Sequence, residues 1–279
     1  MDHTHGPPSR GVATFVDVDG LTLHARVDEP TAPAAGAPTL LFVHSLGTDL
    51  RIWDAVSARL PGFRRVRVDL RGHGLSDAPA GDYALATLAR DVLHVLDRVG
   101  VADAVFVGVS IGGQVAMQAA LDAPERVAGL VLLDTAARIG DRAGWDARRD
   151  EVRAHGLEAS ADAVVGRWFP SASRARDPLA PRGYRNLLLR TPVDGYLGAC
   201  AALRDADLRD RTVDVTQPAL VLFGAEDQAT PPAQVRGLAD ALRDARYVEI
   251  AGAGHLPCLD RPDEVARHVA AFLTARTAP

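Results

Sequence analysis

The residues of this chain with the clearest chemical potential are Ser110 and its immediate neighbours, which read Gly-Val-Ser-Ile-Gly over 108–112. An apolar run precedes them and a helical pattern follows them. A serine in a G-x-S-x-G turn between a strand and a helix is the pattern of a nucleophile elbow, which exposes the hydroxyl at the end of a sheet. Gly108 and Gly112 supply the small neighbours that such a strained turn needs. We therefore predict that Ser110 is a nucleophile; the alternative is a serine that only caps the helix.

A nucleophilic serine needs a base, and the elbow motif predicts its partners in the chain order Ser, then Asp or Glu, then His. His255 follows the last strand pattern in a glycine-containing turn and is the best candidate for the base. Asp227 follows the preceding strand pattern, so its carboxylate should lie at the same sheet edge as Ser110 and orient His255. Asp134 also ends a strand pattern and is a rival for this acidic role.

An oxyanion that develops on a substrate needs N–H donors, and two are expected here. The backbone amide of Ile111, directly after the nucleophile, is predicted to be one of them. The second is expected in the loop after the strand pattern 40–43, where we assign it to the amide of Leu46 and expect Ser45 to border the substrate. His44, which begins this loop, is expected to hold the loop by hydrogen bonds and not to act as the base.

Alternating strand and helix patterns predict the scaffold that positions these residues. Short apolar runs separated by amphipathic helical stretches are typical of a mostly parallel sheet covered by helices on both faces. Asp19 and Gly20 between two alternating runs predict an antiparallel hairpin at the start. The expected fold class is therefore α/β, with helices at 52–60, 85–99 and 262–275. Eight strands are expected, at 13–18, 21–27, 40–43, 66–70, 104–109, 130–133, 219–223 and 247–250.

The segment 136–215 departs from this alternation. It contains helical stretches but no convincing strand, and it is rich in Arg, Asp and Ala. A helical insertion between two strands of a sheet predicts a lid over the site. We therefore expect one structural domain with an α/β core of residues 11–135 and 216–279, a helical lid of residues 136–215 and a flexible tail of residues 1–10.

The composition of the chain argues against several classes of function. Its 279 residues carry a formal net charge of -5, without the basic face expected of a nucleic-acid-binding protein. The two cysteines form no disulfide framework, and no apolar run has the length of a membrane span or the setting of a signal peptide, so we expect a cytoplasmic protein without membrane contact. No metal-site spacing, P-loop or dinucleotide motif occurs, so we expect no metal and no cofactor. The sequence leaves the oligomeric state open.

Several segments together resemble a known family. The elbow, the late Asp and the late His are similar to those of the α/β-hydrolase superfamily across about residues 39–273. The segments that more narrowly resemble bacterial 3-oxoadipate enol-lactonases are 44–48, 69–77, 108–114, 134–136, 191–196 and 200–207. The last two lie in the predicted lid and matter most, because the lid sets substrate choice whereas the elbow is shared by esterases generally. The resemblance implies the α/β-hydrolase fold.

The resemblance also implies a reaction in aromatic-compound catabolism, the hydrolysis of 3-oxoadipate enol-lactone to 3-oxoadipate in the β-ketoadipate pathway. This small-molecule substrate is an unsaturated lactone ring that bears a carboxylate arm. Ser110 would attack the lactone carbonyl, His255 would take its proton and later activate water, and the amides of Leu46 and Ile111 would stabilise the oxyanion. The resemblance implies no cofactor.

The carboxylate arm would need a cationic partner, and the physical expectation is an arginine of the lid. Most lid arginines should be solvated surface residues; the candidates within 136–215 are Arg138, Arg142, Arg167 and Arg204. Aromatic side chains of the same segment are candidates to wall the ring, with packing inside the lid as the alternative; they are Trp145, Trp168 and Tyr196.

Other functions fit the same scaffold, because fold does not fix substrate. A carboxylesterase, another lactonase or a cofactor-free perhydrolase is the alternative enzyme. A non-catalytic binding module is an alternative from another class, and the presence of Ser110, Asp227 and His255 together argues against it.

Overall fold

An eight-stranded sheet forms the centre of the computed structural model, which describes residues 11–32 and 36–277. The predicted tail 1–10 lies outside the described residues. The strands lie in the order β1-β2-β4-β3-β5-β6-β7-β8, in which β1 and β2 pair antiparallel with each other, β2 pairs antiparallel with β4, and all other pairs are parallel. Their bounds are β1 Val12–Val18, β2 Leu21–Asp28, β3 Thr39–Val43, β4 Arg65–Val68, β5 Ala104–Val109, β6 Val127–Leu133, β7 Ala219–Gly224 and β8 Ala245–Ile250. The predicted fold class and the antiparallel hairpin are confirmed.

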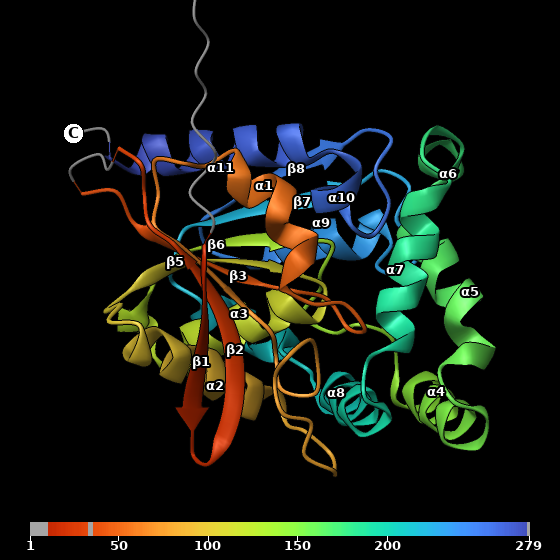
Figure 1. Cartoon of the computed structure of the whole chain (residues 1–279). Coiled ribbons are helices and arrows are strands. Elements are labelled where there is room, and N and C mark those ends of the chain that lie inside the picture. Colours follow the sequence, from red (N-terminus) through yellow and green to blue (C-terminus); the bar gives the residue numbers. More distant parts are fainter. Residues whose placement is uncertain (1–10, 33–35, 278–279) are drawn as a thin grey trace, which may run out of the picture.

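Helices cover both faces of this sheet, which is why its central strands are apolar along their whole length. Every residue of β5 and β7 is buried. Figure 1 shows α1 (Asp54–Ala58) and α11 (Pro262–Thr277) on one face and α2 (Leu85–Arg98) and α3 (Ile111–Asp122) on the other. A further helix, α9 (Pro232–Ala241), packs on β7 and β8. The sheet is therefore the middle layer of three, and its strand ends are the part left free for a site.

Some element boundaries differ from the sequence-based expectation. The helix expected at 52–60 is a 3-10 turn, Leu50–Trp53, followed by the short α1, and the strand expected at 66–70 ends at Val68. A short helix that was not expected, α10 (Pro257–Asp260), comes directly after the loop that carries His255. Two further 3-10 turns, Pro124–Arg126 and Arg209–Asp214, precede β6 and β7.

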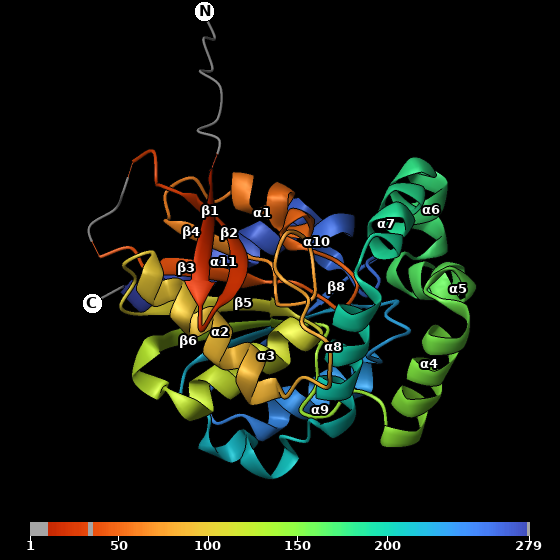
Figure 2. The same cartoon turned by 60° about the horizontal axis from the view of Figure 1, so that its bottom comes forward.

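A helical insertion, residues 136–215, separates β6 from β7. It contains α4 (Arg142–His155), α5 (Glu158–Trp168), α6 (Ser171–Arg176), α7 (Leu179–Leu189) and α8 (Val193–Asp205), and it has no strand within these residues, all of which are described. Figures 1 and 2 show these helices gathered on one side of the sheet. Within residues 11–32 and 36–277, no helix has the length and apolar character that crossing a membrane requires.

The insertion packs against loops that leave the carboxyl ends of the strands. Gly72, in the loop after β4, contacts the backbone of Gly195 at the start of α8, and a Cβ on either residue would collide with the other. Gly254, in the loop after β8, contacts Trp168 and Pro170 of the insertion. The backbones approach this closely because glycine has no side chain. The helical insertion therefore lies over the sheet edge to which Ser110, Asp227 and His255 belong.

Candidate active site

Ser110 occupies a strained turn between β5 and α3. Its φ of 58° lies in the left-handed region that residues with a Cβ seldom adopt. The turn is held from both sides, since the amide of Ser110 donates to the carbonyl of Leu133 (2.9 Å) and the hydroxyl of Thr135 donates to the carbonyl of Ser110 (2.7 Å). A Cβ at position 108 would collide with the carbonyl of Gly112, so the turn requires the glycine that the motif supplies. The backbone of Ser110 is thereby fixed directly before the amino end of α3.

His255 and Asp227 meet at the same edge. The Nδ1 atom of His255 lies 2.9 Å from Oδ2 of Asp227, and both side chains are almost completely buried. The other carboxylate oxygen of Asp227 accepts hydrogen bonds from the amides of Ala229 (2.7 Å) and Thr230 (3.1 Å). Burial raises the pKa of Asp227, but the charge of His255 and these hydrogen bonds outweigh burial and leave the pKa below its ordinary value. Asp227 is thus an anion that fixes the imidazole with Nδ1 protonated and Nε2 free.

Asp134, the rival acid, lies at the end of β6 and is completely buried. Its Oδ1 atom accepts a hydrogen bond from the amide of Gly224 (2.9 Å) and not from His255. Burial, and the neighbouring charge of Asp227, raise the pKa of Asp134 well above its ordinary value. Of the two carboxyl groups, Asp227 is therefore the one that holds the imidazole.

Ser110 and His255 line one cavity of about 170 Å³. Among the described residues, no hydrogen bond joins the serine hydroxyl to the imidazole. Catalytic hydrogen bonds are often long in unliganded enzymes and shorten when substrate binds, so a shared cavity is the relevant relation. Within 11–32 and 36–277, no group of three or more His, Cys, Asp or Glu side chains has an arrangement suited to a metal ion.

Of the two predicted N–H donors, Leu46 lines this cavity and Ile111 directly follows Ser110, which lines it. Ile111 is the first residue of α3, where the amide has no acceptor within the helix. Leu46 lines the cavity together with Ser45 and Ser110. Across the described residues, no hydrogen bond from the amide of Leu46 or Ile111 is found. Both amides are therefore free to donate to a bound oxygen.

Two buried histidines hold the loop that carries Leu46. His44 donates from Nδ1 to the carbonyl of Ser45 (2.8 Å) and accepts at Nε2 from the amide of Leu70 (3.0 Å). His73 accepts at Nε2 from the amide of Gly47 (3.1 Å). Burial lowers the pKa of both histidines, that of His73 to about 3, so they stay neutral and keep these acceptors. His44 thus has the loop-holding contacts that the sequence suggested.

The walls of the cavity come mainly from the helical insertion. Trp145 and Trp168, two of the predicted ring walls, line it, together with apolar residues that include Ile139, Val164 and Leu203. Tyr196 does not line the cavity: it is fully buried, and the guanidinium carbon of Arg148 lies 5.7 Å from the centroid of its ring. Its position is that of a packing residue of the insertion.

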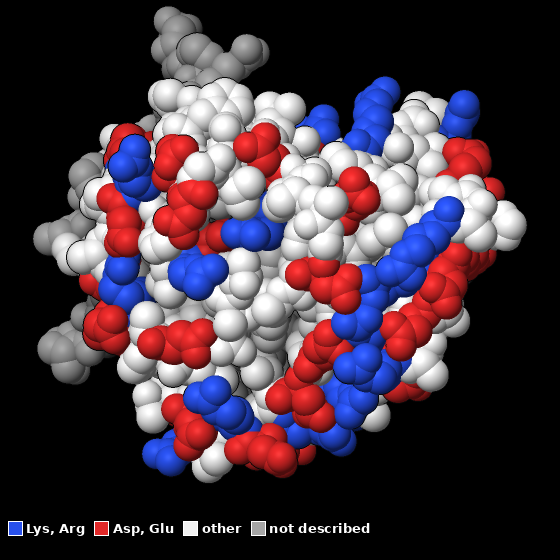
Figure 3. Space-filling view, turned by 90° about the horizontal axis from the view of Figure 1, so that it is seen from below, with Lys and Arg blue, Asp and Glu red and all other residues white. Residues whose placement is uncertain are grey.

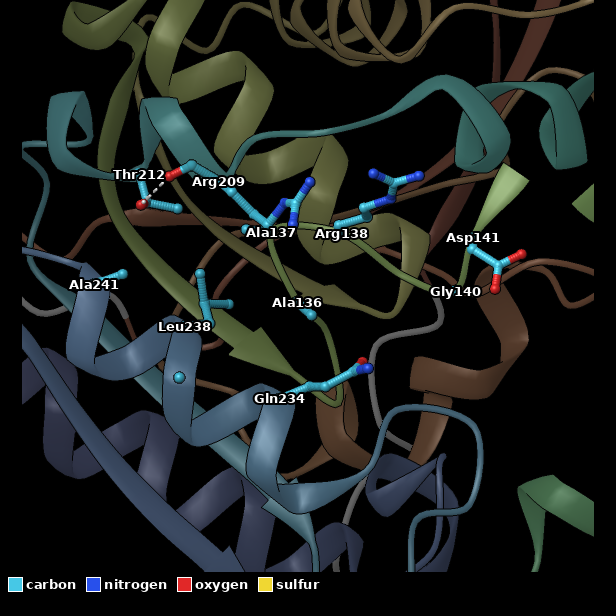
Figure 4. Close-up of a pocket in the computed structure, with 11 residues that line it drawn as sticks. Ala136, Ala137, Arg138, Gly140, Asp141, Arg209, Thr212, Gln234, Leu238 and Ala241 are labelled. Atoms are coloured by element: carbon cyan, nitrogen blue, oxygen red, sulfur yellow. Dashed lines mark hydrogen bonds between the residues drawn. The ribbon is translucent and has the colours of Figure 1, made fainter. Parts of the chain in front are cut away.

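Two of the arginines proposed for substrate binding point elsewhere. Arg138 pairs with Asp207 (3.1 Å) and lines a separate hollow of about 580 Å³ between α9 and residues 136–141, where its guanidinium points away from Leu238 (Figure 4). Arg204 pairs with three carboxylates, Asp82 (3.0 Å), Asp146 (3.3 Å) and Asp205 (2.6 Å). Neither arginine lines the cavity of Ser110, so the expectation that they bind substrate there is corrected.

The remaining candidate outside the cavity, Arg142, is also engaged at the surface. It pairs with Asp205 at 2.6 Å, and its side chain is 62% exposed. Figure 3 views the molecule from below Figure 1, on the side where α4 and α8 lie, and shows a band of basic side chains with acidic side chains along both sides of it. These exposed acidic and basic side chains neutralise one another, and other residues line the cavity.

The cavity instead contains Arg148 and Arg167. Arg167, from α5, was among the candidates, whereas sequence reasoning missed Arg148, from α4. Both are half-buried, and neither has a carboxylate within ion-pair distance among the described residues. Burial and the positive charge of Arg148 lower the pKa of Arg167. The sequence offered one signal for Arg148, its spacing of three residues from Trp145, because residues three apart share one face of a helix.

The comparisons with known proteins agree with this geometry. The alpha/beta hydrolase fold family matches residues 38–262. The 3-oxoadipate enol-lactonase 2 of Acinetobacter baylyi is 32% identical over 240 residues, which are 86% of this chain and 90% of that protein. A pimeloyl-[acyl-carrier protein] methyl ester esterase of Pectobacterium carotovorum is 32% identical over 86% of this chain and 96% of its own. The crystal structure of the enol-lactonase from Burkholderia xenovorans LB400 superimposes with a TM-score of 0.89 at 39% identity, covering 94% of this chain and 100% of that one.

The chain therefore belongs to the alpha/beta hydrolase fold family, as its sheet and elbow indicate. Its resemblance to the 3-oxoadipate enol-lactonases, first suggested by short motifs, is confirmed over nearly the whole described chain.

Proposed function

We propose that this protein hydrolyses 3-oxoadipate enol-lactone to 3-oxoadipate through a serine mechanism. The observation that carries the proposal is the pair Arg148 and Arg167, two guanidinium groups without carboxylate partners in the cavity that also holds Ser110 and His255. A pair of cations at a catalytic serine favours a small substrate with an anionic arm, because guanidinium binds carboxylate strongly where water is partly excluded. The relatives named as 3-oxoadipate enol-lactonases support this substrate.

The reaction follows from the positions of the side chains. His255 takes the proton of Ser110 as the hydroxyl oxygen attacks the lactone carbonyl, and Asp227 keeps the imidazole in the tautomer with Nε2 free. The amides of Leu46 and Ile111 donate to the oxyanion of the tetrahedral intermediate. The ring C–O bond then breaks, the imidazolium of His255 gives its proton to the leaving enolate oxygen, and the resulting enol tautomerises to the ketone.

The second half of the reaction releases the product. Water, deprotonated by His255, attacks the acyl-enzyme on Ser110 and breaks the ester bond, and the serine recovers its proton from the imidazolium. Every step uses only side chains and amides of this chain and one water, so the proposed mechanism needs no cofactor. We assign the helical insertion the role of a lid that excludes bulk water from the acyl-enzyme.

A second candidate is an esterase, because one group of relatives at similar identity is named for the hydrolysis of a methyl ester. The cavity argues for the lactone, since its volume of about 170 Å³ suits a small ring, and a long acyl chain would need more space. Two cations at its wall also favour a small acid over a neutral ester.

The test compares substrates that differ in charge. Steady-state kcat/KM is measured for enzymatically generated 3-oxoadipate enol-lactone, for a neutral lactone without the carboxylate arm, and for p-nitrophenyl acetate. We expect the charged lactone to be the best substrate by at least about tenfold, the ratio that 1.4 kcal/mol of charge recognition provides. Fast cleavage of p-nitrophenyl acetate without turnover of the lactone would replace the proposed substrate by a simple ester.

A further inference from the structure

Two carboxyl groups lie together behind the imidazole of His255. Asp134 directly follows β6, and Asp227 follows the last residue of β7 by three positions. The amide of Gly224, the last residue of β7, donates to Oδ1 of Asp134 (2.9 Å), while its carbonyl accepts from the amide of Asp227 (3.2 Å). Gly224 therefore joins the two acids, and the charge of Asp227 helps to raise the pKa of Asp134.

The second carboxyl oxygen of Asp134 has no donor. Its Oδ2 atom is buried and, within the described residues, no N–H or O–H group reaches it. The neighbouring polar group is the carboxyl of Asp227, which already has donors from His255, Ala229 and Thr230. Two adjacent buried carboxyl groups cannot both be ionised without a large electrostatic penalty, so one proton is shared between them. The distribution of donors puts the negative charge on Asp227 and the proton on Asp134.

The groups that face the pair from the neighbouring short helix supply no positive charge. Asp260 of α10 accepts from the amide of Gly254 (2.9 Å), and burial raises the pKa of its carboxyl. Cys258 of α10 is a buried thiol whose pKa is also raised by burial and by Asp134. Among the described residues, His255 is the group with a possible positive charge that contacts the pair, and it is bound to Asp227. Nothing on this side favours a second anion.

We propose that Asp134 is a positioning residue that stays protonated at neutral pH and donates its carboxyl proton as a hydrogen bond to Asp227. This hydrogen bond fixes the carboxylate that in turn fixes the imidazole of His255. The protonation rests on the buried geometry alone, whereas the positioning role rests on the proposed serine mechanism. The two parts are therefore tested by separate experiments.

The protonation has a signature in stability. The native chain keeps the proton on Asp134, whereas the unfolded chain releases it above about pH 4. Asp134 therefore lowers the free energy of unfolding as the pH rises above about 4. The unfolding equilibrium constant should rise by up to about tenfold per pH unit from this group alone. Asp134→Asn removes the dependence, because an amide cannot lose the proton yet still donates to Asp227 and accepts from Gly224.

The first experiment measures denaturant unfolding of the wild type, Asp134→Asn and the control Asp103→Asn between pH 4.5 and 7.5. Asp103 is exposed, so the control substitution removes a carboxylate that is not buried. We expect the stability of Asp134→Asn relative to wild type to increase steadily with pH, and that of the control to stay flat. A flat difference for Asp134→Asn as well would overturn the protonation.

The second experiment measures how fast a serine-directed organophosphate inactivates each protein as a function of pH. This reaction needs Ser110 and His255 but not the natural substrate, so a wrong substrate assignment leaves it valid. Asp134→Ala removes the hydrogen-bond donor to Asp227, which makes the carboxylate of Asp227 more basic. The acidic limb of the rate profile, where the inactivation rate falls with decreasing pH, should therefore move to higher pH by at least about half a unit. Asp134→Asn should restore the wild-type limb and keep the rate within about threefold. An unchanged limb in Asp134→Ala, or no rescue by Asn, would contradict the positioning role.

Discussion

The sheet edge and the helical insertion contribute to the same cavity, but different interactions hold their charged and polar side chains. At the edge, Ser110, Asp227 and His255 are buried: the amide of Ser110 donates to a carbonyl of β6, and Asp227 accepts from two amides of its own loop and binds His255. In the insertion, arginines such as Arg142 and Arg204 pair with carboxylates at or near the surface. The difference shows what positions each set of residues. The order of the strands places Ser110, Asp227 and His255, whereas the orientation of each helix face decides whether an arginine of the insertion meets the cavity or the surface.

The two regions also differ in what a substitution should cost. A buried polar group that loses its partner is left without water to replace it, whereas an exposed ion pair exchanges one partner for solvent. Changes at the sheet edge should therefore have large effects on the reaction. Changes among the paired arginines of the insertion should have small effects, with Arg148 and Arg167 as the exceptions because they face the cavity.

The largest effect is expected from Ser110→Ala. Loss of the nucleophile should lower kcat by at least about 10⁴-fold, the order found when a member of such a trio is removed. The thermal midpoint should stay close to that of the wild type, because alanine fills the same turn. Steady-state kinetics and a thermal melt measure both. Turnover above one hundredth of the wild-type rate in a folded variant would remove Ser110 from the mechanism.

Asp227→Asn should follow with a loss of about 10³- to 10⁴-fold in kcat. The amide offers a donor where the carboxylate accepts from His255, so it favours the wrong imidazole tautomer. Asp134→Asn is the matched control, since it replaces the neighbouring acid with the same amide and should be far milder. A larger loss in Asp134→Asn than in Asp227→Asn would move the orienting role to Asp134.

The sheet and its edge could be predicted from the sequence because local patterns determine them. Parallel strands bring their carboxyl ends to one edge, so the residues after β5, β7 and β8 had to meet wherever the strands paired. The motif around Ser110 then selected the correct glycine-flanked turn. The exact ends of helices could not be predicted, as the 3-10 turn Leu50–Trp53 shows, because end effects depend on tertiary contacts.

The charged residues of the insertion could not be assigned from the sequence because their partners are distant along the chain. Arg138 pairs with Asp207, 69 positions away, and Arg204 pairs with Asp82, 122 positions away. For Arg204, the packing of α4 against α8 and the position of Asp82 beside both helices decide which carboxylates neutralise it. Arg148 was detectable in principle, because it lies one helical turn from Trp145, a residue already expected at the cavity.

Arg148→Met tests whether the insertion recognises charge. Loss of one of two cavity cations should lower kcat/KM for the carboxylate-bearing lactone by about 10- to 100-fold, equivalent to the 1.5–3 kcal/mol of a charge-assisted hydrogen bond. Methionine keeps most of the packing volume beside Trp145. Turnover of a neutral lactone should change little, and an equal loss for both lactones would indicate a packing effect instead.

Buried residues at the sheet edge should dominate the pH dependence of the free energy of unfolding. His44 and His73 are buried and have lowered pKa values, so the unfolded chain binds protons near pH 6.5 that the native chain does not bind. Their stabilisation is complete above pH 6.5 and is lost as the pH falls, by about 1.4 kcal/mol per pH unit for each histidine. His73→Gln should therefore make the unfolding free energy less steep between pH 6.5 and 5. An unchanged slope in this variant would show that His73 is protonated in the native protein.

The smallest effect is expected from Arg142→Met, which lies on the same helix as Arg148 but faces solvent. Its pair with Asp205 is exposed, and such pairs contribute about 0.2–1 kcal/mol, less as salt screens them. The unfolding free energy should fall by no more than this at low salt, and kcat/KM for the charged lactone should stay within about twofold. Because both variants replace arginine with methionine, a difference between them reports the position of the arginine and not the kind of substitution. A loss of kcat/KM in Arg142→Met as large as that in Arg148→Met would mean that the charge of the whole insertion attracts the substrate, and the distinction between paired and unpaired arginines would no longer hold.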